Sequence, residues 1–336
     1  MTTPKPDPIR AAPWRRWLAA LAPLLLAAGS AQAVVSATGS YPALADADFL
    51  EGMARLSITR SDGSFGCSGS LLAGGTAVLT AAHCLAGANG AATTSSVNLS
   101  WLGGSVTAHS SSYVVASGWT GSLSAGNDLA VVLLSTPVLA VQGYRLAEES
   151  VQGASILLAG YGLTGNGSTG ATANSFGTLH YGFNQYDASA GFYGAVGFQA
   201  SRIGFFDFDN GQSSGNVFGS GGFVQFESMI ASGDSGGASF VHDVASNSWR
   251  LAGVHSFGAC LVLNCTVDSR FGTIGGDVLV AHQSVFISQF ISAVPEPQDW
   301  ALMAGGLLLI GGRLRWRQPG GAPASAARRP SDRRAA

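Results

Sequence analysis

The sequence predicts an all-β protein, and three observations support this fold class. Charged residues are only 11 % of the 336 residues, against about 25 % in an average globular protein, and glycine is abundant at 47 residues. Short apolar runs recur between clusters of Gly, Ser, Asn and Asp, as strands do between turns. The body of the chain shows no long amphipathic pattern before its last segment, so a helical protein is not expected.

Strand-like runs extend through most of the chain. They cover 54–59, 68–72, 77–80, 113–116, 129–134, 155–161, 222–226 and 249–257. The region 163–220 is rich in Gly, Ser, Asn and aromatic residues, so we expect it to form long loops and hairpins that decorate a barrel. Its phenylalanines provide too much apolar surface for a disordered linker.

A single helix is predicted at 281–293. Phe286 and Phe290 lie four residues apart, and so do Ile287 and Ile291, which gives one apolar face at helical spacing. We expect this helix to pack on the barrel as the last element of the domain.

The first 33 residues have the pattern of a secretory signal peptide. A basic stretch with Lys5, Arg15 and Arg16 precedes an apolar run at 17–28, and an Ala-Gln-Ala cleavage site follows at 31–33. We therefore expect the mature chain to begin at Val34. The alternative is a retained membrane anchor, but the apolar run is short for a membrane span.

The charge distribution argues against nucleic-acid binding. Between residues 34 and 297 there are six arginines, sixteen acidic residues and no lysine, since Lys5 is the only lysine of the chain. Proteins that bind nucleic acids need a basic surface, whereas this region is acidic.

Four cysteines, Cys67, Cys84, Cys260 and Cys265, are typical of an oxidising compartment. Three pairings are possible, of which the local one, Cys67–Cys84 with Cys260–Cys265, is the simplest. No Cys-x-x-Cys pair occurs, so a zinc site is not expected. Neither a metal nor a cofactor is predicted.

The segment 294–317 differs sharply from the rest of the chain. Val-Pro-Glu-Pro at 294–297 is followed by an apolar run at 300–312 and by Arg313, Arg315 and Arg317. These three parts in this order resemble the sorting tag of PEP-CTERM proteins. The resemblance implies a Gram-negative bacterium, exosortase processing, and delivery to the cell surface or extracellular matrix. The remaining residues, 318–336, are predicted to be a disordered basic tail. An ordinary single-pass membrane anchor is the alternative.

Three short segments carry residues suited to acyl transfer from a peptide bond. They are Leu-Thr-Ala-Ala-His-Cys at 79–84, Asn-Asp-Leu-Ala-Val-Val-Leu at 127–133 and Ser-Gly-Asp-Ser-Gly-Gly at 232–237. A serine hydroxyl is a weak nucleophile, so it needs a base to accept its proton and a group that orients the base. Ser235, His83 and Asp128 fit these three roles.

The three segments together resemble the trypsin/chymotrypsin family of serine endopeptidases, and the resemblance spans about 50–292. It implies two six-stranded antiparallel β-barrels, at roughly 48–140 and 150–280, with the catalytic residues between them and the helix beyond. The protease domain would cover 34–293. The resemblance also implies an oxyanion hole formed by the N–H groups of Gly233 and Ser235, and it matches the Cys67–Cys84 pair to the family's disulfide behind the histidine. A monomer acting on proteins or peptides is expected, with signal peptidase and exosortase as processing partners.

The resemblance also locates a substrate pocket, with Met229 near its floor and His255, Ser256, Phe257 and Gly258 along one wall. Because no Asp lies at the floor, cleavage after Arg or Lys is disfavoured. The family's cysteine before the Gly-Asp-Ser segment is absent as well, so the pocket walls are expected to differ. His255 favours an acidic residue before the cleaved bond, as in relatives that cut after glutamate. The alternative is a core histidine with a backbone partner, and a preference for small or apolar residues.

The start of the mature chain, 34–37, is a loose counterpart of the family's activated N-terminus. We expect the Val34 amine to pair with Asp234, so that signal cleavage alone activates the protein. The alternative is a disordered front end, with other donors satisfying Asp234.

Two other functions remain open from the sequence. One is a catalytically silent trypsin-fold protein that binds at the surface or in the matrix, and the other is a narrow processing protease acting on sibling surface proteins. An activated serine would distinguish the enzyme from the binding protein.

Overall fold

The structure, a computed structural model, describes most of the chain between residues 34 and 291. The described ranges are 34–41, 43–44, 47–101, 107–110, 112–149, 151–213, 215–219, 226–261 and 266–291, together with the isolated residue Leu307. The predicted signal peptide (1–33) and tail (318–336) and, apart from Leu307, the sorting tag (294–317) lie outside these residues. They stay predictions.

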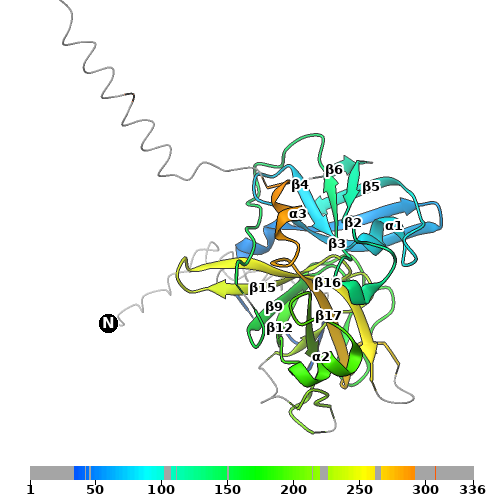
Figure 1. Cartoon of the computed structure of the whole chain (residues 1–336), viewed down its shortest axis with the longest axis vertical. Coiled ribbons are helices and arrows are strands. Elements are labelled where there is room, and N and C mark those ends of the chain that lie inside the picture. The colour runs from blue at the N-terminus through cyan, green and yellow to red at the C-terminus, as the bar shows by residue number, and fades with distance from the viewer. Residues whose placement is uncertain are drawn as a thin grey trace, which may run out of the picture.

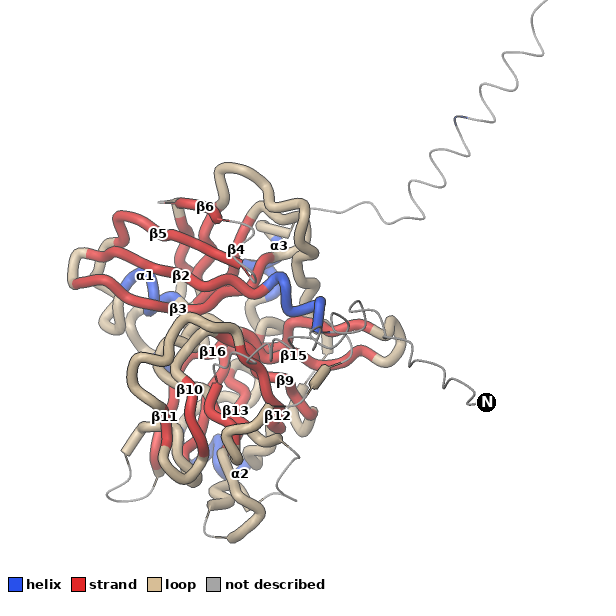
Figure 2. The backbone as a smooth tube through the Cα atoms, turned by 180° about the vertical axis from the view of Figure 1, so that it is seen from behind, coloured by secondary structure: helices blue, strands red, loops and turns tan. Residues whose placement is uncertain are grey.

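Two barrel-like sheets, one nearly closed and the other a half-barrel, form the body of the protein (Figures 1 and 2). The first has seven antiparallel strands in the order β6-β5-β2-β3-β4-β8-β7. Their bounds are β2 Met53–Arg60, β3 Gly63–Leu71, β4 Ala77–Thr80, β5 Thr94–Trp101, β6 Thr107–Ser110, β7 Tyr113–Val115 and β8 Ala130–Leu133. Neighbouring strands of this sheet are also consecutive along the chain, except for the pairs β2–β5 and β4–β8.

The second sheet has six antiparallel strands in the order β12-β9-β15-β16-β17-β13. Their bounds are β9 Ser155–Gly160, β12 His180–Gln185, β13 Ile203–Asp207, β15 Ala238–Asp243, β16 Ser248–Cys260 and β17 Thr273–Leu279. Irregular registers interrupt the pairing of β15 with β16 and of β16 with β17, the second between His255 and Phe257. Bulges of this kind bend a strand and redirect its side chains.

A third, four-stranded sheet attaches the start of the described chain to the second barrel. Its order is β11-β10-β1-β14, with β1 at Val34–Ser36, β10 at Thr164–Asn166, β11 at Gly170–Ala171 and β14 at Ser228–Met229. Strand β1 runs parallel to β10 and antiparallel to β14, with Val35 opposite Met229. The sequence patterns did not predict this sheet, because its strands are only two or three residues long.

The helices are short. They are α1 (Ala82–Ala86), α2 (Ala190–Val196) and α3 (Ser284–Ser288), with 3₁₀ turns at Ala47–Gly52 and Leu123–Ala125. Ser189 caps α2, since its Oγ accepts the Phe192 N–H at 3.3 Å, and Gly197 ends the helix in the left-handed conformation. No described helix is long and apolar enough to cross a lipid bilayer.

The all-β prediction with two barrels is confirmed, and three details differ from it. The first sheet has seven strands because β7 pairs with the edge of β8. The region 163–220 does not only decorate the barrel, since β12 and β13 are integral strands of the second sheet. Helix α3 is shorter than predicted because the chain after it closes i→i+3 turn bonds, from Phe290 to Ile287 and from Ile291 to Ser288. Of the predicted strand at 222–226, only Phe226 lies within the described residues.

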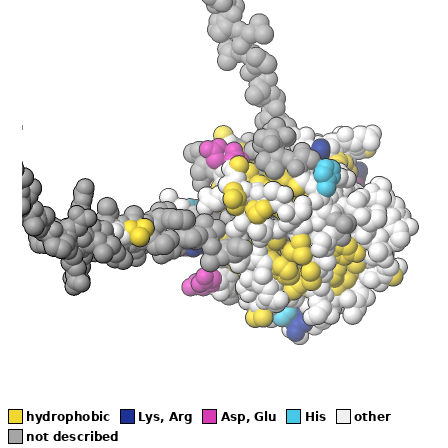
Figure 3. All heavy atoms as spheres, turned by 90° about the horizontal axis from the view of Figure 1, so that it is seen from above, with side chains coloured by type: hydrophobic (Ala, Val, Ile, Leu, Met, Phe, Trp, Pro, Cys, Tyr) yellow, Lys and Arg dark blue, Asp and Glu magenta, His cyan; other side chains and the backbone are white. Residues whose placement is uncertain are grey.

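An aromatic group links the interior of the second barrel to the 3₁₀ turn that precedes β2. Phe240 is fully buried on β15 and contacts Tyr144 and Phe49 at ring-centroid distances of 4.7 and 5.4 Å. Phe49 in turn stacks on Trp249 of β16. The surface carries few charged side chains on the face that the space-filling view shows (Figure 3).

Truncation of this aromatic group tests the packing. Phe240→Ala should lower the free energy of unfolding by about 3–5 kcal/mol, because a fully buried ring is replaced by a cavity. Val244→Ala is the matched control, since Val244 follows β15 directly and is 84 % exposed; it should change stability by less than about 0.5 kcal/mol. Chemical denaturation followed by tryptophan fluorescence measures both, and equal effects would contradict the packing described.

Candidate active site

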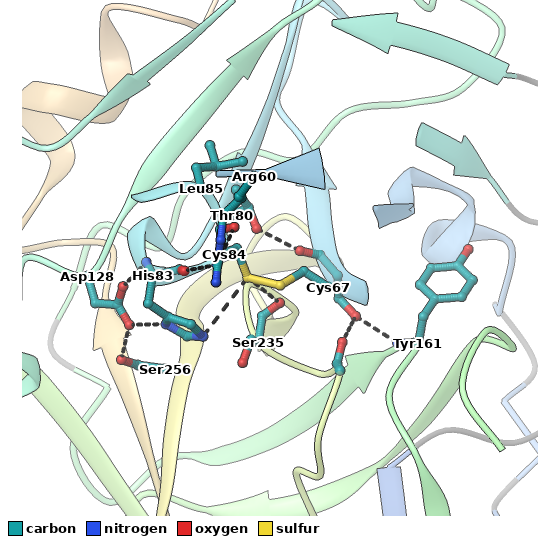
Figure 4. Close-up of a disulfide and its surroundings, with 12 residues drawn as sticks. Arg60, Cys67, Thr80, His83, Cys84, Leu85, Asp128, Tyr161, Ser235 and Ser256 are labelled. Carbon is teal, nitrogen blue, oxygen red and sulfur yellow. Dashed lines mark hydrogen bonds and ion pairs between the residues drawn. A yellow bond between two sulfur atoms is a disulfide. The ribbon is translucent and has the colours of Figure 1, made fainter. Parts of the chain in front are cut away.

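The three residues predicted to act together lie at the seam between the first and second sheets (Figure 4). His83 lies in α1 and Asp128 lies just before β8, both belonging to the first sheet. Ser235 lies in the turn that precedes β15 of the second sheet. The fold therefore brings together three segments that are far apart in the sequence.

Helix α1 is fixed at both ends, which fixes His83. The Thr80 hydroxyl donates to the Ser68 carbonyl at 2.8 Å just before the helix begins. The Arg60 guanidinium donates to the carbonyls of His83 and Cys84 at 2.7 and 2.9 Å. The His83 carbonyl also accepts the Gly87 N–H at 3.1 Å, so Arg60 adds a second donor to it and supplies a donor to the Cys84 carbonyl at the helix end.

A disulfide ties the same helix to β3. Cys84 is bonded to Cys67, as the local pairing predicted. Cys265 lies outside the described residues, so the predicted Cys260–Cys265 pairing stays a prediction.

Asp128 holds the His83 ring. Its carboxylate pairs with His83 Nδ1 at 2.7 Å and accepts the His83 backbone N–H at 2.8 Å. The Ser256 hydroxyl donates to the same carboxylate at 2.5 Å. Asp128 is fully buried, whereas the His83 side chain is 20 % exposed. The proton on Nδ1 is therefore directed at a buried acceptor, and Nε2 is left as the basic nitrogen at the surface of the site.

Ser235 lies on the side of the His83 ring that faces away from Asp128 (Figure 4). The residue is partly buried, and within the described part of the chain its hydroxyl makes no hydrogen bond. Catalytic hydrogen bonds are often long in unliganded enzymes and shorten when substrate binds. The hydroxyl is thus accessible and not committed to a structural partner.

Two backbone hydrogen bonds fix the orientation of the peptide groups on either side of Asp234. The Ser232 carbonyl accepts the Leu163 N–H at 2.9 Å, and the Asp234 carbonyl accepts the Gly237 N–H at 2.7 Å. In a trans peptide the N–H points opposite to the carbonyl, so the N–H groups of Gly233 and Ser235 point away from these bonds. Gly233 has a φ of 96°, which only glycine adopts readily.

Ser68 of β3 connects this turn to the first barrel. Its N–H donates to the Ser235 carbonyl at 2.9 Å, and its hydroxyl donates to the Gly233 carbonyl at 2.9 Å. The same hydroxyl accepts the Tyr161 N–H at 2.8 Å. Ser68 is fully buried, and every polar group it carries has a partner once the bond from Thr80 is included.

A pocket of about 200 Å³ opens beside Ser235. All five predicted pocket residues line it: Met229, His255, Ser256, Phe257 and Gly258. The other lining residues are Ile230, Ala231, Ser232, Ser235, Val267, Ser269 and Thr273. Met229 is buried and belongs to β14, and Phe257 packs against Gly276 on β17. The Ser256 hydroxyl is bonded to Asp128, so this side chain serves the carboxylate as well as the pocket wall.

His255 has a partner that neither sequence-based alternative foresaw. Its Nδ1 pairs with Asp277 at 2.8 Å, and both side chains are fully buried. The other Asp277 oxygen accepts the hydroxyls of Tyr186 and Ser239 at 2.6 and 2.5 Å. His255 Nε2 is buried and has no partner among the described residues, although His255 lines the pocket. His255 is thus a core histidine, as the alternative expected, but the partner of its ring is a carboxylate and not a backbone group.

Asp234 lies buried behind the turn. Its carboxylate accepts the N–H groups of Gly162 and Ala231, both at 2.8 Å. Burial raises the pKa of Asp234 to about 6, while attraction to His255 and these two hydrogen bonds oppose the rise. Within the described residues no arginine, lysine or N-terminal amine forms an ion pair with it.

Several residues that build the site carried no recognisable signal in the sequence. Arg60, Ser68 and Asp277 lie in ordinary strand sequences, and their roles depend on contacts with residues far away in the chain. Among the described residues no group of His, Cys, Asp and Glu is arranged to hold a metal ion.

Comparisons with known proteins identify the family of this chain. The family model described as Trypsin matches residues 49–274. The structure of HL collagenase is similar at 20 % identity and a TM-score of 0.50, covering 75 % of this chain and 97 % of that one. The thermostable serine protease AL20 from an extremophilic microorganism (15 % identity, TM-score 0.48) covers 70 % of this chain and 95 % of its own. The protease Anisep from Arthrobacter nicotinovorans (17 % identity, TM-score 0.46) covers 70 % of this chain and 94 % of its own. A search of curated protein sequences finds no match.

Proposed function

Because the chain belongs to the trypsin family, we propose that it is a serine endopeptidase that forms an acyl-enzyme on Ser235. The observation that carries this proposal is the contact of His83 Nδ1 with the buried Asp128 carboxylate, with Ser235 on the opposite side of the ring (Figure 4). This arrangement gives each step of peptide hydrolysis a candidate residue.

In the proposed reaction, His83 Nε2 accepts the proton of the Ser235 hydroxyl as the oxygen attacks the peptide carbonyl. Asp128 keeps the ring oriented and stabilises the imidazolium. The proton then passes to the leaving amine, the C–N bond breaks, and the acyl group remains as an ester on Ser235. Water repeats the sequence, with its proton going to His83 and then to the serine oxygen as the ester bond breaks.

The N–H groups of Gly233 and Ser235 are proposed to stabilise the negative oxygen that forms in each step. Their orientation supports this role, because the opposing carbonyls are already hydrogen-bonded and cannot rotate freely. Donors fixed in advance need no reorganisation during the reaction, which makes such stabilisation effective.

We further propose that the pocket prefers an acidic side chain before the cleaved bond. His255 Nε2 supports this preference, since it is a buried nitrogen without a partner in the wall of the pocket. An acidic side chain would share a proton with Nε2, and Asp277 on Nδ1 would offset the positive charge of the ring. None of the described residues that line the pocket carries a carboxylate that would attract Arg or Lys, and Met229 lies where the family's floor is expected.

Removal of the first 33 residues is proposed to activate the protein by freeing the Val34 amine to pair with Asp234. Val34 is fully buried on β1, and the Tyr41 hydroxyl donates to its carbonyl. Tyr41 also interacts electrostatically with Asp234, so both residues lie in the same region. Val34 has a φ of 74° in the uncut chain, an unfavourable conformation for a β-branched residue. Cleavage before Val34 removes the peptide group that defines this angle and so removes the strain.

The finer assignments of location follow from the sequence alone. We propose export through the signal peptide at 1–33 and sorting to the surface of a Gram-negative bacterium through the segment 294–317, with exosortase as the processing partner. This segment would contact the membrane transiently.

Removal of the nucleophile tests the reaction. Ser235→Ala should lower hydrolysis of casein by at least about 10⁴-fold and abolish labelling by a fluorophosphonate, with an unchanged circular dichroism spectrum. Ser246→Ala, in the exposed turn between β15 and β16, is the control and should be labelled normally. Wild-type activity in Ser235→Ala would refute the assignment, and a wild-type protein that resists the label would favour the catalytically silent alternative.

The preference for acidic residues is tested with matched peptides that carry Glu or Gln before the cleaved bond. The wild-type kcat/KM should be at least about 10-fold higher for Glu, because one polar contact distinguishes the two side chains. His255→Gln should bring this ratio close to one. Cleavage after small or apolar residues with none after Glu would show that the preference is wrong.

The N-terminal pairing is tested by adding one alanine before Val34. The extended form should be roughly 100-fold less active than the mature form, because a buried carboxylate loses its partner. Val34→Ile, which keeps the free amine, is the control and should retain activity. An extended form with full activity would contradict the pairing.

The same two forms should differ in the pH dependence of stability. In the extended form the Asp234 pKa of about 6 lies above its ordinary value near 3.8, so the folded state binds the proton more tightly than the unfolded state. Stability then falls as the pH rises from about 4 to 6, by on the order of 3 kcal/mol. The stability of the mature form should not fall between pH 4 and pH 6. Thermal unfolding at pH 4 and pH 7 measures the difference between the two forms, and parallel curves would argue against the pairing.

A further inference from the structure

Phe176 places an aromatic ring next to the proposed oxyanion hole. It lies in the loop between β11 and β12 and is 36 % exposed. Its ring packs against two glycines, one from each barrel: a Cβ atom on Gly66 of β3 would come within 2.4 Å of the ring, and one on Gly233 within 2.6 Å. Neither position tolerates a side chain while the ring remains there, so the ring bridges the seam through backbone contacts.

Both neighbours of Phe176 are tied down, which fixes the ring. The Ser175 hydroxyl accepts the Thr164 N–H at 2.8 Å and donates to the Thr172 carbonyl at 2.6 Å. The Gly177 N–H donates to the Tyr161 carbonyl at 2.9 Å, and Arg55 donates to the Gly177 carbonyl at 3.3 Å. An exposed aromatic ring on a restrained loop loses little conformational entropy on binding a ligand.

The ring of Phe176 lies outside the pocket that is proposed to receive the acyl side of the substrate. The pocket for the acyl side is walled by residues 229–232 and 256–258, and Phe176 does not line it. Phe176 instead covers Gly66, whose neighbour Cys67 is bonded to Cys84, the residue after His83. His83 is the proposed proton donor to the leaving amine, so the leaving half of the substrate departs past this disulfide.

We propose that Phe176 binds the leaving half of the substrate and selects a large apolar side chain within the first two residues after the cleaved bond. This inference rests on the proposed acyl-enzyme mechanism and adds a determinant of specificity to it. An apolar side chain lying on the ring would be removed from water together with the exposed third of the ring, which is favourable.

Transfer of the acyl group to added amines measures this binding directly. In the reverse of the cleavage step, an amino acid amide attacks the Ser235 ester, a C–N bond forms, and the C–O bond to Ser235 breaks. The amine proton passes to His83 and then to the serine oxygen. The partition of one acyl-enzyme between water and each amine therefore reports only how the leaving side binds.

The experiment uses an ester substrate with phenylalanine amide, leucine amide, arginine amide and glycine amide as acceptors. The wild-type protein should prefer phenylalanine and leucine amides over glycine amide by at least about 10-fold. Phe176→Ala should bring these ratios close to one, and Phe176→Leu should retain most of the preference for leucine amide. Val244→Ala, remote from the site, should keep the wild-type ratios.

This measurement distinguishes substrate binding by the Phe176 ring from a purely structural role of the ring against Gly233. If the ring has only a structural role, Phe176→Ala lowers hydrolysis and transfer to all amines alike and leaves the ratios between amines unchanged. That result would overturn the proposal. Wild-type ratios near one, or a wild-type preference for arginine amide, would overturn it as well. An acyl-enzyme that forms and hydrolyses without discriminating among the amines leaves the protease function standing. The absence of any acyl-enzyme in the wild-type protein would overturn both.

Discussion

The joint between the two barrels depends on one buried residue, Ser68. Four hydrogen bonds meet there: two go to the carbonyls of the turn that carries Ser235, one comes from the start of the second barrel at Tyr161, and one comes from Thr80 at the entry to α1. A buried serine is costly unless its groups are all paired, and here they are. Its neighbourhood is equally tight, since a Cβ atom on Gly236 would lie 2.4 Å from the Ser68 carbonyl. The relative position of histidine and serine is therefore set by backbone contacts that permit little adjustment.

The molecule contains two histidine–aspartate pairs with opposite surroundings. His83 and Asp128 form a pair in which the histidine side chain is 20 % exposed and the carboxylate is fully buried. His255 and Asp277 are completely enclosed, and Tyr186 and Ser239 complete the hydrogen bonds of the carboxylate. The same chemical pair can serve proton transfer in the first setting and rigid support of a pocket wall in the second. Exposure of the ring nitrogen, which no sequence motif reports, makes the difference.

The parts of the fold that were predictable are those encoded locally. Apolar runs predicted five of the seven strands of the first sheet but only two of the six strands of the second, β9 and β16. Three short motifs selected His83, Asp128 and Ser235, which the fold brings to one seam. The strand β12 was missed because its buried face carries the polar residues His180 and Asn184 while Tyr181 and Phe183 are only half-buried, which reverses the usual alternation. The strand β13 was missed because its buried run lies within a glycine- and serine-rich region. Residues such as Arg60, Asp277 and Phe176 act across long sequence separations, and a single sequence does not show which distant residue each will meet.

Burial of Val34 also has a chemical consequence for the chain that the proposed processing would produce. The only lysine, Lys5, lies in the predicted leader, so the processed chain would carry a single primary amine at its own N-terminus. With Val34 fully enclosed, that amine would be out of reach of aldehydes and reducing sugars, which modify amines on protein surfaces. The folded, processed chain would thus resist glycation at amines and would offer no cleavage point to lysine-specific proteases.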